Sequence, residues 1–146
     1  MASVHEVAKY FLTLGDEEAG DFLSNLKLQK LCYYAQGFHL ALFGKSLFDD
    51  RIEAWQHGPV VPDLYHAYKV NGSGAIPMPQ GFDIIAIDKQ VRDLLDEVYN
   101  TYGQFSAWKL RNMTHDEVPW VQAFGRDAGA EITTSSMQDF FKTLLI

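Results

Sequence analysis

Residues 26–43 read LKLQKLCYYAQGFHLALF, a run with the length and composition of a long helix. Apolar residues recur along it at helical spacing and mark one face, yet others, such as Tyr33, lie outside that face. A helix that is apolar nearly all round is buried in the protein interior. Ser24 or Asn25 can cap its start, and Gly44 can end it. The run therefore predicts a central, buried helix.

The segments after this helix predict a minor β element, a short helix and a loop. Residues 46–55 have the pattern of a small β-hairpin, with its turn at Asp49 and Asp50. Residues 62–68 can form a short helix, because a proline is tolerated at the first helical position. Residues 71–82 are rich in glycine and proline, so we expect an exposed loop there.

Helical periodicity and capping residues predict the remaining helices. They cover residues 3–14, 88–102, 106–113, 119–124 and a last stretch from Thr134 or Ser135, with residues 16–21 as an acidic linker after the first. Gly37 disfavours a helix by about 1 kcal/mol relative to Ala, so we expect another backbone to pass close to it. The predicted fold is mainly α. It is a single domain over residues 1–146, a compact bundle of about seven helices around the central helix, with the minor hairpin.

Composition limits the classes of partner. The chain has 146 residues and a net charge of −7, with 19 acidic against 12 basic residues, and the basic residues form no cluster. An acidic surface repels the phosphate backbone, so direct nucleic-acid binding is not expected, whereas a basic protein partner suits it. No signal peptide and no apolar run of membrane-spanning length is visible. We expect a cytoplasmic protein that does not bind membranes.

Residues that carry enzyme chemistry are few. No phosphate-binding glycine loop, nucleophile elbow or zinc-binding His-Glu-x-x-His pair is present. The single cysteine, Cys32, is a candidate nucleophile with His39 as base, but both fall on the predicted buried face. A metal site would need convergence of three side chains from a scattered set, namely His57, His66, His115, Asp116 and Glu117. We expect no catalytic residue, no metal and no cofactor.

Large aromatic side chains are more numerous than the core strictly needs. They are Trp55, Tyr65, Tyr68, Trp108 and Trp120. Aromatic residues often anchor protein interfaces, although each could equally be a core residue. Trp55 and Trp120 are the two considered for an interface.

Three segments, in this order and spacing, resemble the Panacea domain, the SocA-like antitoxin family also met as the phage-associated protein GepA. The resemblance covers essentially the whole chain from Val7. The first segment is Leu26, Lys27, Leu28, Gln29, Lys30, Leu31, Tyr33, Tyr34, Ala35 and Gln36; the second is Glu53, Ala54, Trp55, Gly58, Pro59, Val60, Pro62 and Tyr65; the third is Thr114, His115, Glu117, Pro119 and Trp120.

The resemblance implies a helical domain that neutralises a toxin encoded beside it, in bacteria or prophages. We expect a preformed partner-binding surface near Trp55, His57, Tyr65 and Trp120, with the turn at Gly58-Pro59 fixing Trp55 relative to Tyr65. The motifs can instead record only the architecture, with Thr114 capping the helix that contains Glu117.

Two other functions stay open. One is a proteolytic adaptor or phage regulatory protein that also binds a protease, with residues 71–82 as its second surface. The other is a hydrolase that uses His57, His115 and Glu117. The sequence does not indicate an oligomeric state.

Overall fold

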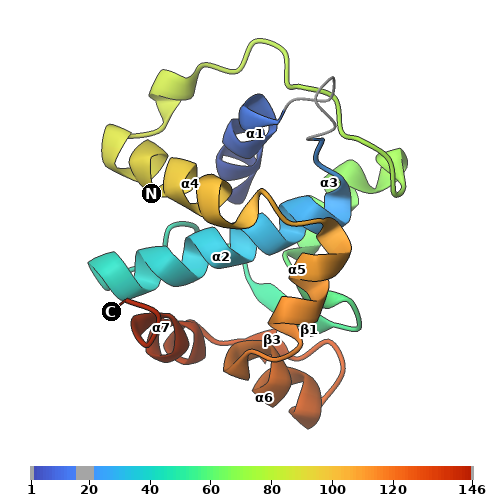
Figure 1. The fold of residues 1–146 in the computed structure, drawn as a ribbon, viewed down its shortest axis with the longest axis vertical. Helices are drawn as coiled ribbons and strands as arrows, with labels where there is room; N and C mark the ends of the chain where they lie inside the picture. Colours follow the sequence, from blue (N-terminus) through green and yellow to red (C-terminus); the bar gives the residue numbers. More distant parts are fainter. Residues whose placement is uncertain (1, 16–21, 146) are drawn as a thin grey trace.

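Helix α2, Asn25–Phe43, crosses the middle of the molecule and confirms the predicted central helix. The computed structural model describes residues 2–15 and 22–145, so the predicted acidic linker at residues 16–21 lies outside the described residues. In Figure 1, α1 and α4 lie on one side of α2, and α6 and α7 lie on the other. All residues of α2 from Lys27 to Gly37 are buried.

The mainly α fold is confirmed. The described residues form seven α-helices, which are α1 Val4–Leu14, α2 Asn25–Phe43, α3 Pro62–Tyr68, α4 Lys89–Tyr102, α5 Ala107–Thr114, α6 Val118–Arg126 and α7 Thr134–Lys142. Two short 3₁₀ helices, η1 Lys69–Asn71 and η2 Ile84–Ala86, flank the predicted loop. The N-terminal capping box is present, because the side chain of Ser3 accepts from the backbone of Glu6 and the Glu6 side chain accepts in return.

The small sheet differs from the hairpin predicted near residues 46–55. Strand β1, Ile52–Trp55, matches the predicted second arm, but it pairs with β2, Gly58–Val60, and on its other edge with β3, Glu131–Ile132, both antiparallel. The turn between β1 and β2 therefore lies at residues 56–57. It is closed by Gly58, whose φ of 109° falls in the region that favours glycine.

The predicted first arm at residues 46–48 is not a strand because a side chain of α2 takes its backbone groups. The Leu47 amide donates to Gln36 Oε1 at 2.7 Å, and Gln36 Nε2 donates to the Phe48 carbonyl at 2.8 Å. Both hydrogen bonds are buried. They leave those groups unavailable for pairing with another strand.

Two further polar side chains of α2 hold β2 in place. Gln29 Oε1 accepts from the Val61 amide at 2.9 Å, and Lys30 Nζ donates to the Pro59 carbonyl at 3.0 Å. Pro59 has no amide hydrogen, and the two side chains bind its carbonyl and the Val61 amide. The outer edge of β2 is therefore not free to pair with another chain.

The close approach expected at Gly37 comes from a side chain and not from a backbone. A Cβ added at Gly37 would overlap the ring of Phe141 on α7. Phe141 is fully buried and also makes edge contacts with Tyr33 and Phe38. Gly37 therefore provides the space in which α7 docks on α2.

Candidate functional site

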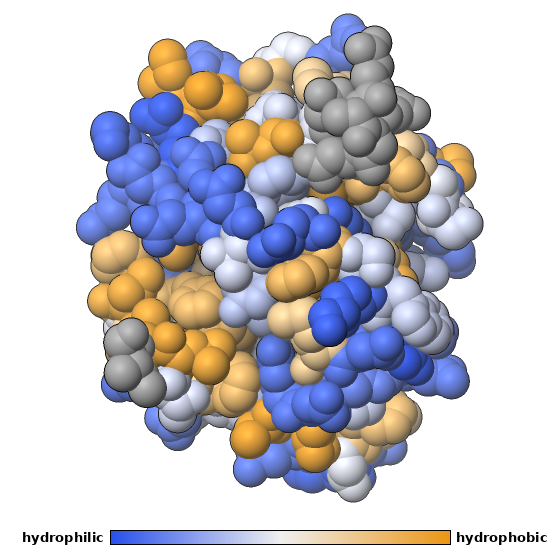
Figure 2. Space-filling view, viewed as in Figure 1, coloured by the Kyte–Doolittle hydropathy of each residue, from blue (hydrophilic) through white to orange (hydrophobic). Residues whose placement is uncertain are grey.

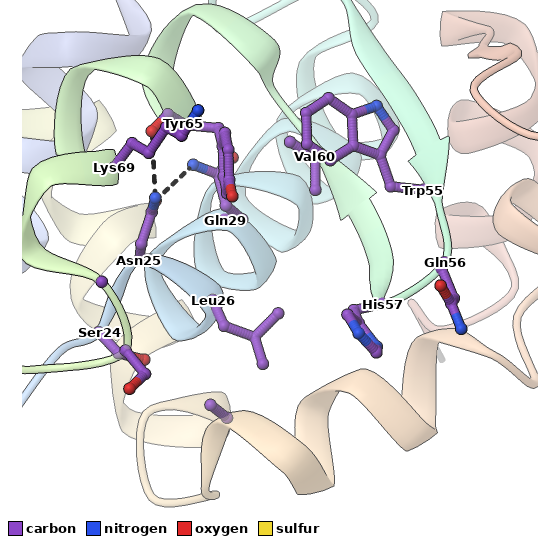
Figure 3. Close-up of a pocket in the computed structure, with 13 residues that line it drawn as sticks. Ser24, Asn25, Leu26, Gln29, Trp55, Gln56, His57, Val60, Tyr65 and Lys69 are labelled. Atoms are coloured by element: carbon purple, nitrogen blue, oxygen red, sulfur yellow. Dashed lines mark hydrogen bonds between the residues drawn. The ribbon is translucent and has the colours of Figure 1, made fainter.

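An open groove of 560 Å³ lies where the start of α2, the β1–β2 turn, α3 and the start of α5 meet (Figure 3). Its walls are mostly apolar. They are formed by Ser24, Asn25, Leu26, Gln29, Trp55, Gln56, His57, Val60, Tyr65, Lys69, Gly72, Ser73 and Ala107. Gly72 and Ser73 belong to the predicted loop, so the loop contributes to this groove.

The groove brings together three of the four side chains predicted to bind a partner. The rings of Trp55 and Tyr65 meet edge to face, with their centroids 5.0 Å apart. Trp55 Nε1 donates to Glu53 Oε1 at 2.9 Å, which fixes the indole in one orientation. His57 lies across the groove, above α5, on the side of Leu26 (Figure 3). The wall formed by Trp55 and Tyr65, called the aromatic wall, is therefore held in place without a partner.

Trp120, the fourth predicted side chain, is not among the residues that line the groove. Its side chain is only 9% exposed and is stacked between His115, at 4.0 Å between ring centroids, and Phe124, at 4.6 Å. Its Nε1 donates to the Trp55 carbonyl at 2.8 Å. Trp120 therefore supports the strand that carries Trp55 from beneath and does not line the groove.

An exposed cluster lies next to the groove; the sequence analysis named its tryptophan, Trp108, but missed Arg111. Trp108 on α5 is 56% exposed, and the Arg111 guanidinium lies 4.4 Å from the centre of its ring. Arg111 Nε also donates to His57 Nδ1 at 3.2 Å, which requires the tautomer of His57 that carries its proton on Nε2. The spacing of Trp108 and Arg111, three residues apart on one helix, was the available signal.

Glu117 is the centre of a partly buried polar cluster. Tyr33 donates to its Oε1 at 3.0 Å and Tyr34 to its Oε2 at 2.8 Å. Burial raises the pKa of Glu117 to about 7, against the effect of the two tyrosine hydroxyls, and Asp116 adds to the rise. Burial also raises the pKa of both tyrosines far above their ordinary range, so they remain protonated.

Lys30 is the second perturbed group, and it lies beneath the β1–β2 turn. Burial lowers the pKa of Lys30 to about 7, and the charge of Arg111 contributes. A Cβ added at Gly58 would lie 2.5 Å from Lys30 Cε and 2.8 Å from Thr114 Oγ1. Only glycine fits at this position, both for its φ and for the space.

The remaining residues of the three segments are mainly architectural in their contacts. Most of them are buried: Lys27, Leu28, Leu31, Ala35, Gln36, Ala54, Val60, Thr114 and Pro119, while Leu26, Glu53 and Pro62 are partly exposed. Lys27 Nζ donates to the Gly103 carbonyl at 2.6 Å. The prediction that Thr114 caps the helix containing Glu117 is wrong. Thr114 ends α5, where its hydroxyl donates to the Arg111 carbonyl at 2.8 Å, and Glu117 is itself the N-cap residue of α6.

The side chains considered as metal ligands are not grouped among the described residues. In residues 2–15 and 22–145, no three His, Cys, Asp or Glu side chains are grouped so that they could hold a metal ion. Cys32 is fully buried, and burial raises the pKa of its thiol far above the ordinary range. His39 Nδ1 is bonded to the Lys45 carbonyl at 2.6 Å.

A bilayer crossing requires a long apolar helix, and none occurs among the described residues.

Comparison with known proteins identifies the family. The chain matches the family described as "Antitoxin SocA-like, Panacea domain" over residues 28–121. It is also 34% identical, over 109 residues, to Antitoxin SocA of Caulobacter vibrioides (strain NA1000 / CB15N). That alignment covers 67% of this chain and 58% of the relative, so the chain spans little more than half of the relative's length. No solved structure matches the chain. The family match includes most of α2, the β1–β2 hairpin and Glu117, and the chain belongs to the Panacea-domain family of SocA-like antitoxins.

Proposed function

We propose that this chain is a cytoplasmic antitoxin, of bacterial or prophage origin, that neutralises its toxin by direct binding and has no catalytic activity. The toxin-binding surface is the groove lined by Trp55, His57 and Tyr65. The observation that carries the proposal is this open, mostly apolar groove of 560 Å³ in a chain of the antitoxin family.

The geometry of the groove supports protein binding. Trp55 is held by Tyr65, by Glu53 and, through its carbonyl, by Trp120. A partner that packs on Trp55 therefore does not have to order it, and preorganisation of this kind improves affinity. A large aromatic side chain at the edge of an apolar depression is also the usual form of an interface hot spot.

Co-expression with the product of the adjacent gene tests the proposal. The chain is expected to form a complex in a pull-down and to restore growth of cells that express that product. Trp55→Ala combined with Tyr65→Ala should abolish both effects. Val121→Ala is the control, because Val121 is an exposed apolar residue on α6 that lines neither this groove nor the second one. A wild-type chain that neither binds nor restores growth would exclude the proposed function.

A proteolytic adaptor is the second candidate, and a second groove favours it. This groove of 460 Å³ lies between the end of α2, α4 and the end of the chain, and it includes Leu42, Leu144 and Leu145, each at least 40% exposed. Figure 2 shows apolar side chains gathered below α4 on this face. Leu42 and these two C-terminal leucines are therefore exposed apolar side chains.

An adaptor needs one surface for the toxin and another for the protease that degrades it. Leu42→Asp combined with Leu144→Asp should then leave toxin binding unchanged and lengthen the half-life of the toxin in cells. An unchanged half-life in cells that express this double variant would leave simple binding as the mechanism.

A further inference from the structure

The walls of the toxin-binding groove differ in charge from the rest of the protein. The chain has 19 acidic and 12 basic residues. None of the described side chains that line the groove is acidic, whereas Lys69 lies on one side of it and His57 on the other (Figure 3). Among the described residues, the groove wall therefore carries a cation and no carboxylate.

Two cations beside the aromatic wall have no carboxylate partner. In the part of the chain that the structure describes, neither Lys69 nor Arg111 forms an ion pair. Arg111 is fixed by its stacking on Trp108, by its bond to His57 and by donation from Nη1 to Asn112 Oδ1 at 3.0 Å. Its Nη2 donates to no acceptor among the described residues. A guanidinium held in one orientation with a free donor is a preformed site for a carboxylate.

The nearest acidic residue on the hairpin is already neutralised. Glu53 is paired with Arg51 at 3.0 Å and accepts from Trp55 Nε1 at 2.9 Å. It therefore does not cancel the positive charge of Lys69 and Arg111. Asp63 on α3 and Asp116 after α5 do not line the groove.

We propose that the groove binds an acidic segment of the toxin. An apolar side chain of that segment packs against Trp55 and Tyr65, and its carboxylates pair with Lys69 and Arg111. This inference rests on the proposed function and makes it specific. It reverses the expectation from net charge, since a chain of charge −7 would be paired with a basic partner.

Charge reversal at the two cations tests the inference. The full chain and its Lys69→Glu/Arg111→Glu variant are titrated with the purified product of the adjacent gene in 50 mM and 500 mM salt. The double variant is expected to bind at least tenfold more weakly at low salt, and the difference should shrink at high salt as the charges are screened. Unchanged or tighter binding by the double variant would overturn the inference.

Lys109→Glu is the matched control. It makes the same change on the same helix, but two positions from Arg111, and so on roughly the opposite side of α5. Its affinity should stay within twofold of the wild type. Lys69→Glu alone, at an exposed position, keeps the test valid if the Arg111 variant fails to fold, which circular dichroism reports.

A second measurement separates this inference from the proposed function. A random peptide library displayed on phage is selected on the immobilised full chain, and the selected peptides should carry net negative charge beside a large apolar residue. Neutral or basic peptides, or no enriched peptides, would overturn the inference. If the wild-type chain restores growth but the charge reversals do not weaken binding, the acidic segment is excluded and the antitoxin function stands.

Discussion

Lys30 is buried and Glu117 is partly buried; both are hydrogen-bonded, and neither forms an ion pair within the described residues. Burial disfavours the charged form of each group, so it raises the pKa of Glu117 and lowers that of Lys30, in both cases to about 7. Each shift therefore makes the stability of the fold depend on pH, in opposite directions and in different windows.

The variant Glu117→Gln tests the pH dependence of stability that Glu117 causes. Below pH 4.5, Glu117 is protonated in both the folded and the unfolded chain, and its titration does not change the free energy of unfolding. As the pH rises from 4.5 to about 7, the unfolded chain loses the proton first, so the folded state loses about 3 kcal/mol relative to it. Gln does not titrate. The free energy of unfolding of Glu117→Gln, minus that of the wild type, should therefore rise over this window in urea titrations.

Asp139→Asn is the control for that measurement, because it removes an exposed carboxylate that does not contribute to the pKa of Glu117. Its free energy of unfolding should follow the wild type across the same window. Parallel pH profiles for Glu117→Gln and the wild type would show that the Glu117 carboxyl titrates alike in the folded and unfolded chain.

At the scale of the element, α7 can dock on α2 because Gly37 has no Cβ. Gly37→Ala should favour the isolated helix by about 1 kcal/mol, yet the new Cβ would overlap the Phe141 ring. Overpacking of this kind typically costs about 1–3 kcal/mol. We therefore expect a net loss of stability in thermal melts.

Phe141→Leu should partly rescue Gly37→Ala, because it removes the ring that the new Cβ meets. A double-mutant cycle measures this coupling directly. If the two substitutions destabilise the fold additively, the packing of α7 on α2 does not depend on the space at Gly37.

The hairpin offers a second test at this scale. Trp120→Phe removes the donor to the Trp55 carbonyl and leaves a small void, which together should cost about 1–3 kcal/mol. Toxin affinity should fall less than it does in Trp55→Ala, since Trp120 supports the strand and does not line the groove. Equal loss of binding by the two variants, with the fold of Trp120→Phe intact, would place Trp120 in the interface.

The sequence predicts elements better than it predicts the contacts between them. The central helix was predictable because its apolar pattern and its caps are local signals. The roles of Gln36 and Lys30 were not, because a polar residue on a helix is normally taken as solvent-facing, and both side chains bind backbone groups of the following segments. The misplaced hairpin arm follows directly from the hydrogen bonds of Gln36.

The same difference applies to the candidate site. Trp55 and Tyr65 could be predicted as neighbours from the stiff turn between them, and they are in contact. Trp120 is bonded to the Trp55 carbonyl, and His57 contacts Arg111. In each pair the residues are more than 50 positions apart in the sequence, and no local pattern indicates such contacts. Net charge gave no sign that the described groove wall carries Lys69 and no carboxylate, because it averages over the whole surface.

At the scale of the whole molecule, the part of the chain that matches the family does not include all of the fold. The match ends at residue 121, before β3 and α7. Yet β3 forms one edge of the sheet, and α7 covers α2 through Phe141, which is fully buried against Tyr33 and Tyr34. The described helices therefore surround one continuous core.

Removal of residues 127–146 tests whether this core is one cooperative unit. The truncated chain keeps the matched residues 28–121 and most of the groove, but it exposes the face of α2 around Gly37 and leaves β1 with a free edge. Because one face of the central helix then lacks its cover, we expect no cooperative thermal transition and binding of a hydrophobic dye. A truncation at residue 142, which keeps α7, is the matched control and should melt cooperatively. A cooperative melt of the shorter chain near the temperature of the full one would instead make residues 1–126 a unit that folds by itself, with α7 as an addition to it.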